Sequence, residues 1–167
     1  NHVPKKMKNA ILAIEDRRFY QHKGVDAVGV GRAIVKNLAG ASHEGASTIT
    51  MQVARNFFLS SDRTLRRKIS EIFLSYKIEK NLTKDQILEL YINQIYLGQR
   101  AYGFGAASLV YYGKPLEKLT LAECALLAGL PKAPSNYNPF TNAKRGIQRQ
   151  HEVLKNMLRY EFIDQKA

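Results

Sequence analysis

The sequence predicts a mainly α-helical fold, formed by residues 1–167 as a single domain. Apolar residues recur at helical spacing along most of the chain, and two Thr-x-x-Gln or Thr-x-x-Glu patterns mark helix starts. No alternation of apolar and polar residues runs longer than a few positions, so no long strand is expected. A chain of 167 residues with 45% hydrophobic residues can bury one compact core.

The first predicted helix carries its apolar residues on one stripe, which consists of Val3, Met7, Ile11 and Ile14. The stripe ends at Glu15 and Asp16, so two carboxylates fall at a helix end. An aromatic loop over residues 19–24 follows. Asp26 is the expected N-cap of a second helix that runs to about Leu38.

After a polar break over residues 40–45, Ser47 is the expected N-cap of a third helix that runs to about Phe57. Spacing places three of its residues on one polar face: Gln52, Arg55 and Asn56. The next helix carries an apolar stripe made of Leu65, Ile69, Ile72, Phe73 and Tyr76. Its charged residues lie away from the stripe's centre and are expected to face a cleft: Arg67, Lys68 and Glu71.

Two capping boxes predict helix starts in the second half of the chain. Thr83 and Gln86 open a helix with five inward residues, namely Ile87, Leu88, Tyr91, Ile92 and Ile95. Thr120 and Glu123 open another helix, which ends at Gly129. A last helix is marked by Ile147, Leu154 and Leu158.

A net charge of +12 and a pI near 9.9 predict an anionic partner. Composition alone leaves a nucleic acid, an acidic membrane surface and a phosphorylated substrate open. Cys124 is the only cysteine, and its apolar helical surroundings favour packing in the core over reactivity. The histidines lack ligand spacing, which argues against a zinc site. No stretch reaches the roughly 20 apolar residues of a membrane-spanning helix.

Glu15 and Glu71 each stand beside basic residues and fall on different predicted helices. Two carboxylates in this relation suit general acid–base chemistry on sugars. The alternative is that each carboxylate is solvated or caps a helix, as most helix-terminal carboxylates do. Spacing alone leaves both interpretations open.

Five motifs follow one another along nearly the whole chain, at residues 15–26, 45–50, 67–71, 87–93 and 149–154. In this order they resemble the signatures of glycosyltransferase family 51, the peptidoglycan glycosyltransferase (transglycosylase) domain of bifunctional class A penicillin-binding proteins. The third motif reads Arg-Lys-x-x-Glu and the fifth reads Arg-x-x-x-Val-Leu, as in that family. The chain departs from the family pattern where Met51 replaces a glutamine and where Arg55 replaces the lysine of many relatives.

The resemblance implies a lysozyme-like fold, with a larger lobe and a smaller membrane-proximal lobe flanking a cleft. It also implies a parent protein with a membrane anchor before Asn1 and a transpeptidase domain after Ala167. That parent would act at the extracytoplasmic (periplasmic) face of the bacterial cytoplasmic membrane. The implied partners are lipid II, the growing lipid-linked glycan, the membrane surface and a phosphoglycolipid inhibitor of the moenomycin type, and not a nucleic acid.

The implied reaction joins lipid II units into β-1,4-linked glycan, with inversion and with release of undecaprenyl pyrophosphate. Glu15 would take the proton of the acceptor hydroxyl, because a sugar hydroxyl is too weak an acid to ionise at neutral pH. Arg55, Arg63 and Lys68 would stabilise the pyrophosphate leaving group. Glu71 would orient Lys68 or hold a divalent cation, Mg²⁺ or Mn²⁺, whose requirement the sequence leaves open.

The same resemblance assigns ten residues to substrate binding: Asp16, Arg18, Arg32, Ser47, Thr48, Gln52, Arg55, Asn56, Arg63 and Arg67. Structural interpretations stand beside this one, since a surface arginine is often only solvated, Ser47 can simply cap a helix, and His22 can support the aromatic loop. Residues 25–41 mix apolar residues with Arg32 and Lys36, a pattern that suits either a membrane interface or an ordinary buried helix.

Two other functions compete with polymerisation. A lysozyme-like hydrolase or lytic transglycosylase also uses a glutamate on glycan, but it cuts the chain. The cluster of Arg55, Arg63 and Lys68 argues against cutting, because a glycosidase has no pyrophosphate to bind. A basic nucleic-acid-binding module fits the charge alone, but carboxylates interleave with the basic residues and no recognition signature is present.

Overall fold

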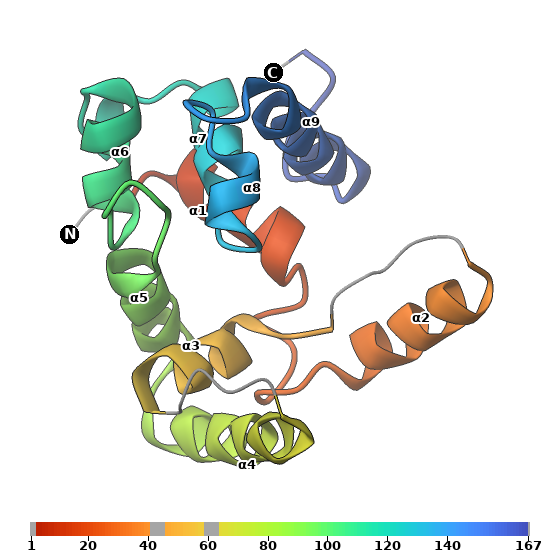
Figure 1. The fold of residues 1–167 in the computed structure, drawn as a ribbon. Coiled ribbons are helices and arrows are strands. Elements are labelled where there is room, and N and C mark those ends of the chain that lie inside the picture. Colours follow the sequence, from red (N-terminus) through yellow and green to blue (C-terminus); the bar gives the residue numbers. More distant parts are fainter. Residues whose placement is uncertain (1–2, 41–45, 59–63, 167) are drawn as a thin grey trace. The chain divides into compact units, whose positions relative to one another are not determined.

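Helices form most of the structure, a computed structural model that describes residues 3–40, 46–58 and 64–166 (Figure 1). The helices of these residues are α1 (Lys5–Glu15), α2 (Ala27–Leu38), α3 (Ile49–Phe58), α4 (Leu65–Asn81), α5 (Lys84–Gln94), α6 (Phe104–Tyr112), η1 (Leu116–Lys118), α7 (Leu121–Ala128), α8 (Pro134–Tyr137) and α9 (Ala143–Arg159). Within the described residues, extended pairing is limited to an isolated bridge between Tyr96 and Tyr102. The prediction of a mainly α-helical fold is therefore confirmed.

Two compact units make up the chain. The first unit comprises Asn1–Arg17 and Ile92–Ala167, and the second, smaller unit comprises Arg18–Tyr91. This division matches the larger and smaller lobes that the family resemblance implies. The cleft and the membrane-proximal position of the smaller lobe stay predictions.

In the first unit, α1 packs against α7 and α9. Met7 and Ile11 of the predicted stripe are fully buried, and α1 ends at Glu15 as predicted. The predicted capping box opens α7, because the Thr120 hydroxyl accepts from the Glu123 N–H and the Glu123 carboxylate accepts from the Thr120 N–H. Two helices thus support the segment that ends in Glu15.

Cys124 lies inside α7 and is fully buried, as the sequence predicts. Burial raises the pKa of its thiol to about 11, so the reactive thiolate is a minor form at neutral pH. Its role is packing in the core of the first unit.

The last predicted helix is confirmed as α9, but two of the three apolar residues that mark it do not face the core. Ile147 and Leu158 are largely exposed. The inward residues keep helical spacing and are Gly146, Arg149, Val153 and Met157. Apolar periodicity missed this face because one inward residue is a glycine and another is an arginine.

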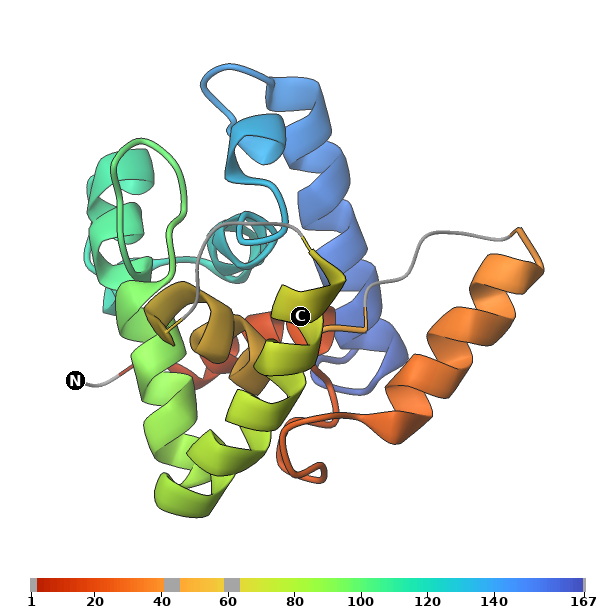
Figure 2. The same ribbon diagram turned by 60° about the horizontal axis from the view of Figure 1, so that its bottom comes forward.

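In the second unit, α3 lies beside α4, and α2 projects away from both of them (Figures 1 and 2). Most of the apolar stripe predicted for α4 is exposed: Leu65, Ile69, Phe73 and Tyr76. The inward residues of α4 are Glu71, Ser75 and Ile78. The expectation that Glu71 faces an open cleft was therefore wrong, because its side chain is 0% exposed. Two neighbouring cations make this burial tolerable.

The aromatic loop between α1 and α2 is fixed by polar contacts. The Thr48 hydroxyl donates to the Gly24 carbonyl at 2.6 Å, and the Gly24 N–H donates to Nδ1 of His22 at 3.0 Å. The His22 ring also lies edge-on to Phe19, with 6.0 Å between ring centroids. These contacts support the structural interpretation of His22.

Gly24 has a φ of +111°, and a Cβ there would lie 3.1 Å from the Ser75 carbonyl group in α4. We expect Gly24→Ala to lower the free energy of unfolding by about 1–3 kcal/mol, because the added methyl meets backbone that cannot move aside. Urea unfolding measures the change. Gly31→Ala in α2 is the control, since nothing lies within 4 Å of its Cβ and stability should stay or rise slightly. Equal unfolding midpoints for both variants would refute this expectation.

Candidate active site

The Glu15 side chain lies at the carboxyl end of α1. It is mostly buried, and its Oε1 is 4.0 Å from Nη2 of Arg149 in α9. Asp16 follows as the C-cap, with its N–H donating to the Leu12 carbonyl at 3.1 Å and its side chain buried. The predicted placement of two carboxylates at a helix end is thus present in the first unit.

Arg149 is a residue to which the sequence reasoning gave no role, although it begins the fifth motif. Its Nε donates to the Gly129 carbonyl at 3.2 Å, and its Nη1 donates to Oε2 of Glu152 at 2.6 Å. A buried arginine needs such partners, because its charge is costly to remove from water. The feature of the sequence that could have identified Arg149 is its position on the helix face that also carries Val153 and Met157.

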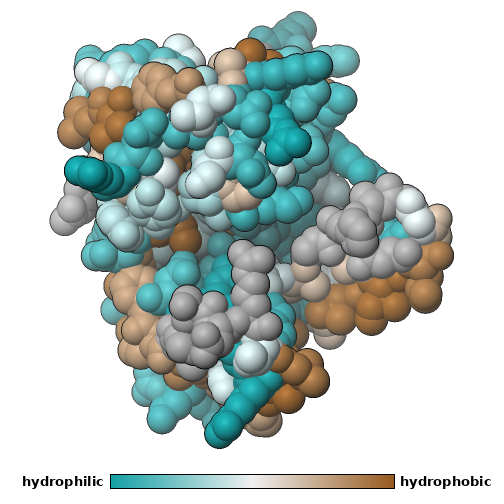
Figure 3. All heavy atoms as spheres, in the orientation of Figure 1, coloured by the Kyte–Doolittle hydropathy of each residue, from teal (hydrophilic) through white to brown (hydrophobic). Residues whose placement is uncertain are grey.

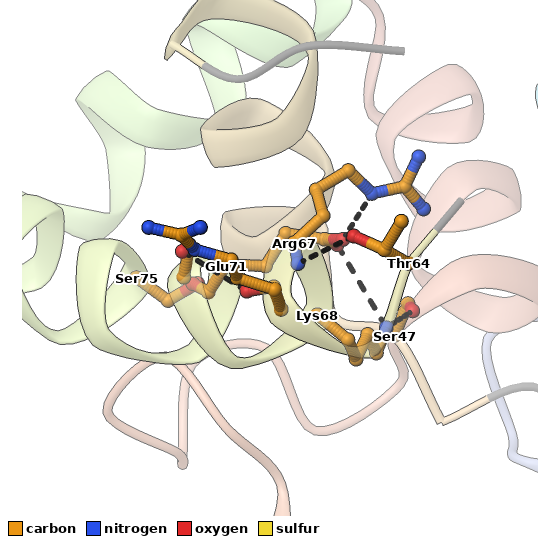
Figure 4. A network of polar contacts seen from close by, with 8 residues as sticks. Ser47, Thr64, Arg67, Lys68, Glu71 and Ser75 are labelled. Carbon is orange, nitrogen blue, oxygen red and sulfur yellow. Dashed lines mark hydrogen bonds and ion pairs between the residues drawn. The ribbon is translucent and has the colours of Figure 1, made fainter. Parts of the chain in front are cut away.

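A cluster of polar side chains forms where α3 and α4 begin in the second unit (Figure 4). The Arg67 Nε donates to Oε2 of Glu71 at 3.2 Å, and the Lys68 Nζ lies 3.7 Å from Oε1 of Glu71. The Lys68 Nζ also donates to the Ser47 Oγ at 2.5 Å. One buried carboxylate therefore holds two cations, and one of these is directed by Ser47.

Local sequence explains how α4 builds this cluster. Thr64 is the N-cap of α4, and its hydroxyl accepts from the Arg67 N–H at 3.1 Å. Residues three and four positions apart lie on the same side of a helix, so Lys68 and Arg67 both reach Glu71. The Arg-Lys-x-x-Glu motif is thus a helical arrangement of two cations over one carboxylate.

The pKa of Lys68 lies below the usual value for lysine. Burial of the ammonium group is the largest cause, and the positive charges of Arg55 and Arg67 add to it, whereas Glu71 opposes the shift. Arg55 of α3 therefore acts electrostatically on Lys68 of α4. Arg63, predicted to belong with them, lies outside the described residues.

Glu71 does not fit a divalent cation in this arrangement. Mg²⁺ and Mn²⁺ prefer several oxygen ligands, whereas Glu71 faces the cations Arg67 and Lys68. Among the residues that the structure describes, no three His, Cys, Asp or Glu side chains come together as a metal site. The geometry fits the other predicted role of Glu71, which is to orient Lys68, and no step proposed below uses a metal.

Thr48 caps α3, so the predicted cap at Ser47 was wrong by one residue. The Thr48 hydroxyl accepts from the Met51 N–H at 3.1 Å while it donates to the Gly24 carbonyl. These two bonds assign Thr48 to the scaffold. Ser47 instead accepts from Lys68, which puts its hydroxyl in the cationic cluster.

The other predicted binding residues of the second unit are spread over several elements. The Arg18 Nε lies 3.3 Å from Oδ1 of Asp26, which also accepts an N–H from the first turn of α2. Gln52 is buried, with its Oε1 3.5 Å from the Tyr91 hydroxyl. Three more lie on α2 or α3 with partly or largely exposed side chains: Arg32, Arg55 and Asn56. Two predicted carboxylates, Glu15 and Asp16, thus lie at a helix end in the first unit. In the second unit, printed contacts join four of the predicted residues in one cluster: Ser47, Arg67, Lys68 and Glu71.

Comparison with known families shows the family to which the chain belongs. A family model described as Transglycosylase matches residues 1–158. The chain belongs to the transglycosylase family. The family predicted from the five motifs is confirmed, and membership supports peptidoglycan glycosyltransferase activity in cell wall synthesis.

Similar proteins agree with this assignment. A Cupriavidus necator protein named as a candidate transglycosylase is 61% identical over 156 residues, which cover 93% of this chain and 68% of that protein. Penicillin-binding protein 1A of Neisseria cinerea is 59% identical over 161 residues, which cover 96% of this chain and 20% of that protein. The chain therefore spans about a fifth of this second relative.

A solved structure shares the fold of this transglycosylase chain. The crystal structure of penicillin-binding protein 1A from Haemophilus influenzae matches 98% of this chain and 15% of its own length, with a TM-score of 0.54 and 28% sequence identity. The match confirms the predicted helical fold and is consistent with its lysozyme-like character.

Proposed function

We propose that this transglycosylase domain polymerises lipid II into β-1,4-linked glycan, with inversion at the anomeric carbon and release of undecaprenyl pyrophosphate. The observation that carries the proposal is the pair of cations, Arg67 and Lys68, held by the buried Glu71. Such a cluster suits a pyrophosphate leaving group, whereas cutting a glycosidic bond produces no anion of this kind.

Glu15 is the proposed general base. The 4-hydroxyl of the acceptor must lose its proton as its oxygen attacks the anomeric carbon, and a carboxylate within hydrogen-bond reach can take that proton. The placement of Glu15 supports the role, because its side chain is mostly buried at the end of α1 and its Oε1 lies 4.0 Å from the Arg149 guanidinium.

Lys68 and Arg55 are proposed to stabilise the departing pyrophosphate. Negative charge grows on the leaving oxygen as its bond to the anomeric carbon breaks, and cations already in place stabilise the transition state more than the ground state. Ser47 and Glu71 contact the Lys68 ammonium group and fix its direction. Arg63 is assigned the same task by the family resemblance.

The lowered pKa of Lys68 predicts a specific pH dependence. Lys68 loses its proton at a lower pH than an ordinary lysine, so anion binding should weaken as the pH rises through that lowered pKa. We expect Lys68→Arg to move the alkaline fall of kcat/KM to higher pH, because a guanidinium stays protonated. Lys77→Arg, an exposed change on the same helix, is the control. An unchanged alkaline fall in Lys68→Arg would contradict the assignment.

The remaining polar residues are proposed to contact the sugars and phosphates of donor and acceptor. They are Asp16, Arg18, Arg32, Gln52, Asn56 and Arg67. Arg67 would do so while its Nε donates to Oε2 of Glu71, and a guanidinium suits a phosphate because of its planar arrangement of N–H donors.

Contact with a membrane surface is supported by exposed apolar side chains of the second unit. On α2 these are Val28, Ile34, Val35 and Leu38. On α4 they are Leu65, Ile69, Phe73 and Tyr76. Leu38 is 84% exposed and Phe73 is 72% exposed, and Figure 3 shows a hydrophobic surface over α2. Apolar residues of this kind, on a chain with a net charge of +12, suit the interface of an anionic bilayer.

The proposed location is the extracytoplasmic face of the bacterial cytoplasmic membrane, where a lipid-linked substrate keeps its tail in the bilayer. In residues 3–40, 46–58 and 64–166, no helix has the length and apolar character needed to cross that bilayer. The proposal concerns contact with the surface and uses α2 and α4 alone.

Membrane contact predicts weaker liposome binding when a charge enters the apolar surface. We expect Val35→Asp and Phe73→Asp each to weaken cosedimentation with anionic phospholipid vesicles by about tenfold, because a buried apolar side chain contributes about 1.5–3 kcal/mol. Leu109→Asp, on α6 of the first unit, is the matched control, since Leu109 is also exposed. Equal losses in all three variants would show that the added charge alone is responsible.

Further partners follow from the relatives. The chain matches a fifth of the Neisseria cinerea penicillin-binding protein 1A, which supports a longer parent protein. We infer that such a parent also carries a membrane anchor and a transpeptidase domain. A phosphoglycolipid inhibitor of the moenomycin type would occupy the Lys68 cluster, because it offers a phosphate together with a lipid.

Product analysis with lipid II tests the proposed reaction. The chain is incubated with lipid II in detergent, and both the glycan and the released lipid are quantified. We expect one undecaprenyl pyrophosphate for each new bond, and a polymer that muramidase cuts to disaccharide units, because muramidase requires β-1,4 bonds. Lipid II that stays intact under these conditions would overturn the proposal.

A further inference from the structure

Arg149 of α9 is held by several neighbours in the first unit. Arg149 is buried, with an exposed fraction of 6%. Three guanidinium nitrogens have separate neighbours: Nε binds the Gly129 carbonyl, Nη1 binds Glu152, and Nη2 points to Glu15 at 4.0 Å. The guanidinium also lies over the Tyr137 ring, 5.3 Å from its centroid. A planar guanidinium group that is held at several points has a fixed orientation.

Gly129 provides the space for this side chain. Its φ of −78° is one that any residue adopts, so backbone conformation does not require a glycine there. A Cβ at this position would lie 2.6 Å from Cγ of Arg149. The missing side chain at the end of α7 therefore leaves the path by which Arg149 reaches Glu15.

A second glycine fixes the aromatic face of the same arrangement. A Cβ on Gly146 of α9 would lie 2.9 Å from the Tyr137 carbonyl oxygen. Close packing of α8 on α9 at this glycine brings the Tyr137 ring against the guanidinium of Arg149. Both glycines thus serve the placement of a single cation.

The distance to Glu15 explains what this cation can do. At 4.0 Å, the Nη2–Oε1 contact is an ion pair but too long for a hydrogen bond. Arg149 therefore attracts the carboxylate without occupying a lone pair of Oε1 through a short bond. Glu152, whose side chain is 62% exposed, accepts from Nη1, so the two terminal nitrogens of Arg149 contact different carboxylates.

We propose that Arg149 is the positioning residue of the Glu15 base, and that Gly129 exists to let its side chain pass. The inference rests on the proposed function, because it needs Glu15 to be the base. It predicts that disturbing Arg149 reduces turnover while substrate binding persists, since the substrate's phosphates are assigned to the second unit.

Kinetics of three variants of this chain test the proposal with lipid II as substrate. We expect Arg149→Met to lower kcat by about 100-fold with little change in KM, because small displacements of a base cost this much. Arg149→Lys keeps the positive charge but lacks the planar guanidinium group, so its kcat should lie between those of the parent and Arg149→Met. Gly129→Ala should lower kcat in the same direction, because it pushes the Arg149 side chain away. Thermal unfolding confirms that each variant is folded at the assay temperature.

The control variant changes another residue of α9. Lys155→Met removes one exposed positive charge from α9 and should leave kcat and KM unchanged. A folded Arg149→Lys with the parent's kcat would overturn the positioning role, as would a rise in KM with kcat preserved. If the parent chain does not polymerise lipid II, the proposed function itself fails, and this result is distinguishable because it involves no Arg149 variant.

Discussion

Glu15→Gln is expected to abolish glycan polymerisation, with kcat falling by about 10²–10⁴-fold. Glutamine keeps the size of the side chain and can accept a hydrogen bond, but it cannot take the proton of the acceptor hydroxyl. KM for lipid II should change little, because the cations assigned to the pyrophosphate lie on other elements. Gel analysis of glycan made from labelled lipid II measures the loss.

The control for this prediction makes the same chemical change elsewhere in the first unit. Glu117→Gln alters an exposed carboxylate in η1 and should polymerise at the parent's rate. Unfolding curves of Glu15→Gln should show a folded protein at the assay temperature. A folded Glu15→Gln that retains more than a tenth of the parent's kcat would remove Glu15 from the role of base.

Glu71→Gln is expected to impair both stability and activity. Its carboxylate is fully buried between Arg67 and Lys68, so removing the charge leaves two cations that repel each other. We expect the free energy of unfolding to fall by about 1–3 kcal/mol, less than for a fully buried pair because Lys68 is partly exposed. Activity should fall by about 100-fold, because Lys68 loses the partner that directs it.

The measurement combines urea unfolding with turnover below the unfolding transition. Glu89→Gln on α5 changes an exposed carboxylate and should alter neither quantity. Activity of a folded Glu71→Gln equal to that of the parent would show that Glu71 only stabilises α4. If added Mg²⁺ or Mn²⁺ restores the activity of Glu71→Gln, Glu71 would have a role in binding a metal ion.

Much of the fold could be predicted from local sequence, because helix starts are set by short-range hydrogen bonds. Thr83 with Gln86 and Thr120 with Glu123 form the predicted reciprocal caps. The stripe of α1 and its end at Glu15 were also predictable, since an apolar spacing that stops at charged residues is visible in a single sequence.

The face that a helix buries was harder to predict, because burial depends on partners far away in the sequence. In α4 the apolar residues Leu65 and Phe73 face outward, while Glu71 points inward. Periodicity favours apolar burial and does not anticipate a buried carboxylate that is neutralised by two cations. We propose that the exposed stripe contacts a lipid surface. The spacing of apolar residues along the helix is the same whether they face lipid or a protein core, so the sequence pattern does not distinguish the two.

The candidate site was predictable at the level of motifs and less so at the level of contacts. The Ser47 Oγ, two residues before α3, and the Lys68 Nζ of α4 lie 2.5 Å apart, a pairing that no local rule predicts. Thr48 competes with Ser47 for the cap of α3, and both residue types suit an N-cap equally. Arg149 reaches Glu15 through space left by Gly129, and such a path depends on how α7 and α9 pack.

The central claim is that this chain builds glycan. The most direct measurement places labelled lipid II and unlabelled preformed glycan in one reaction with the chain in detergent, and follows both by gel. We expect that the label enters long polymer and that the preformed glycan keeps its length. Shortening of the preformed glycan, with the label left in lipid II, would contradict the proposed polymerase activity and favour a lytic enzyme.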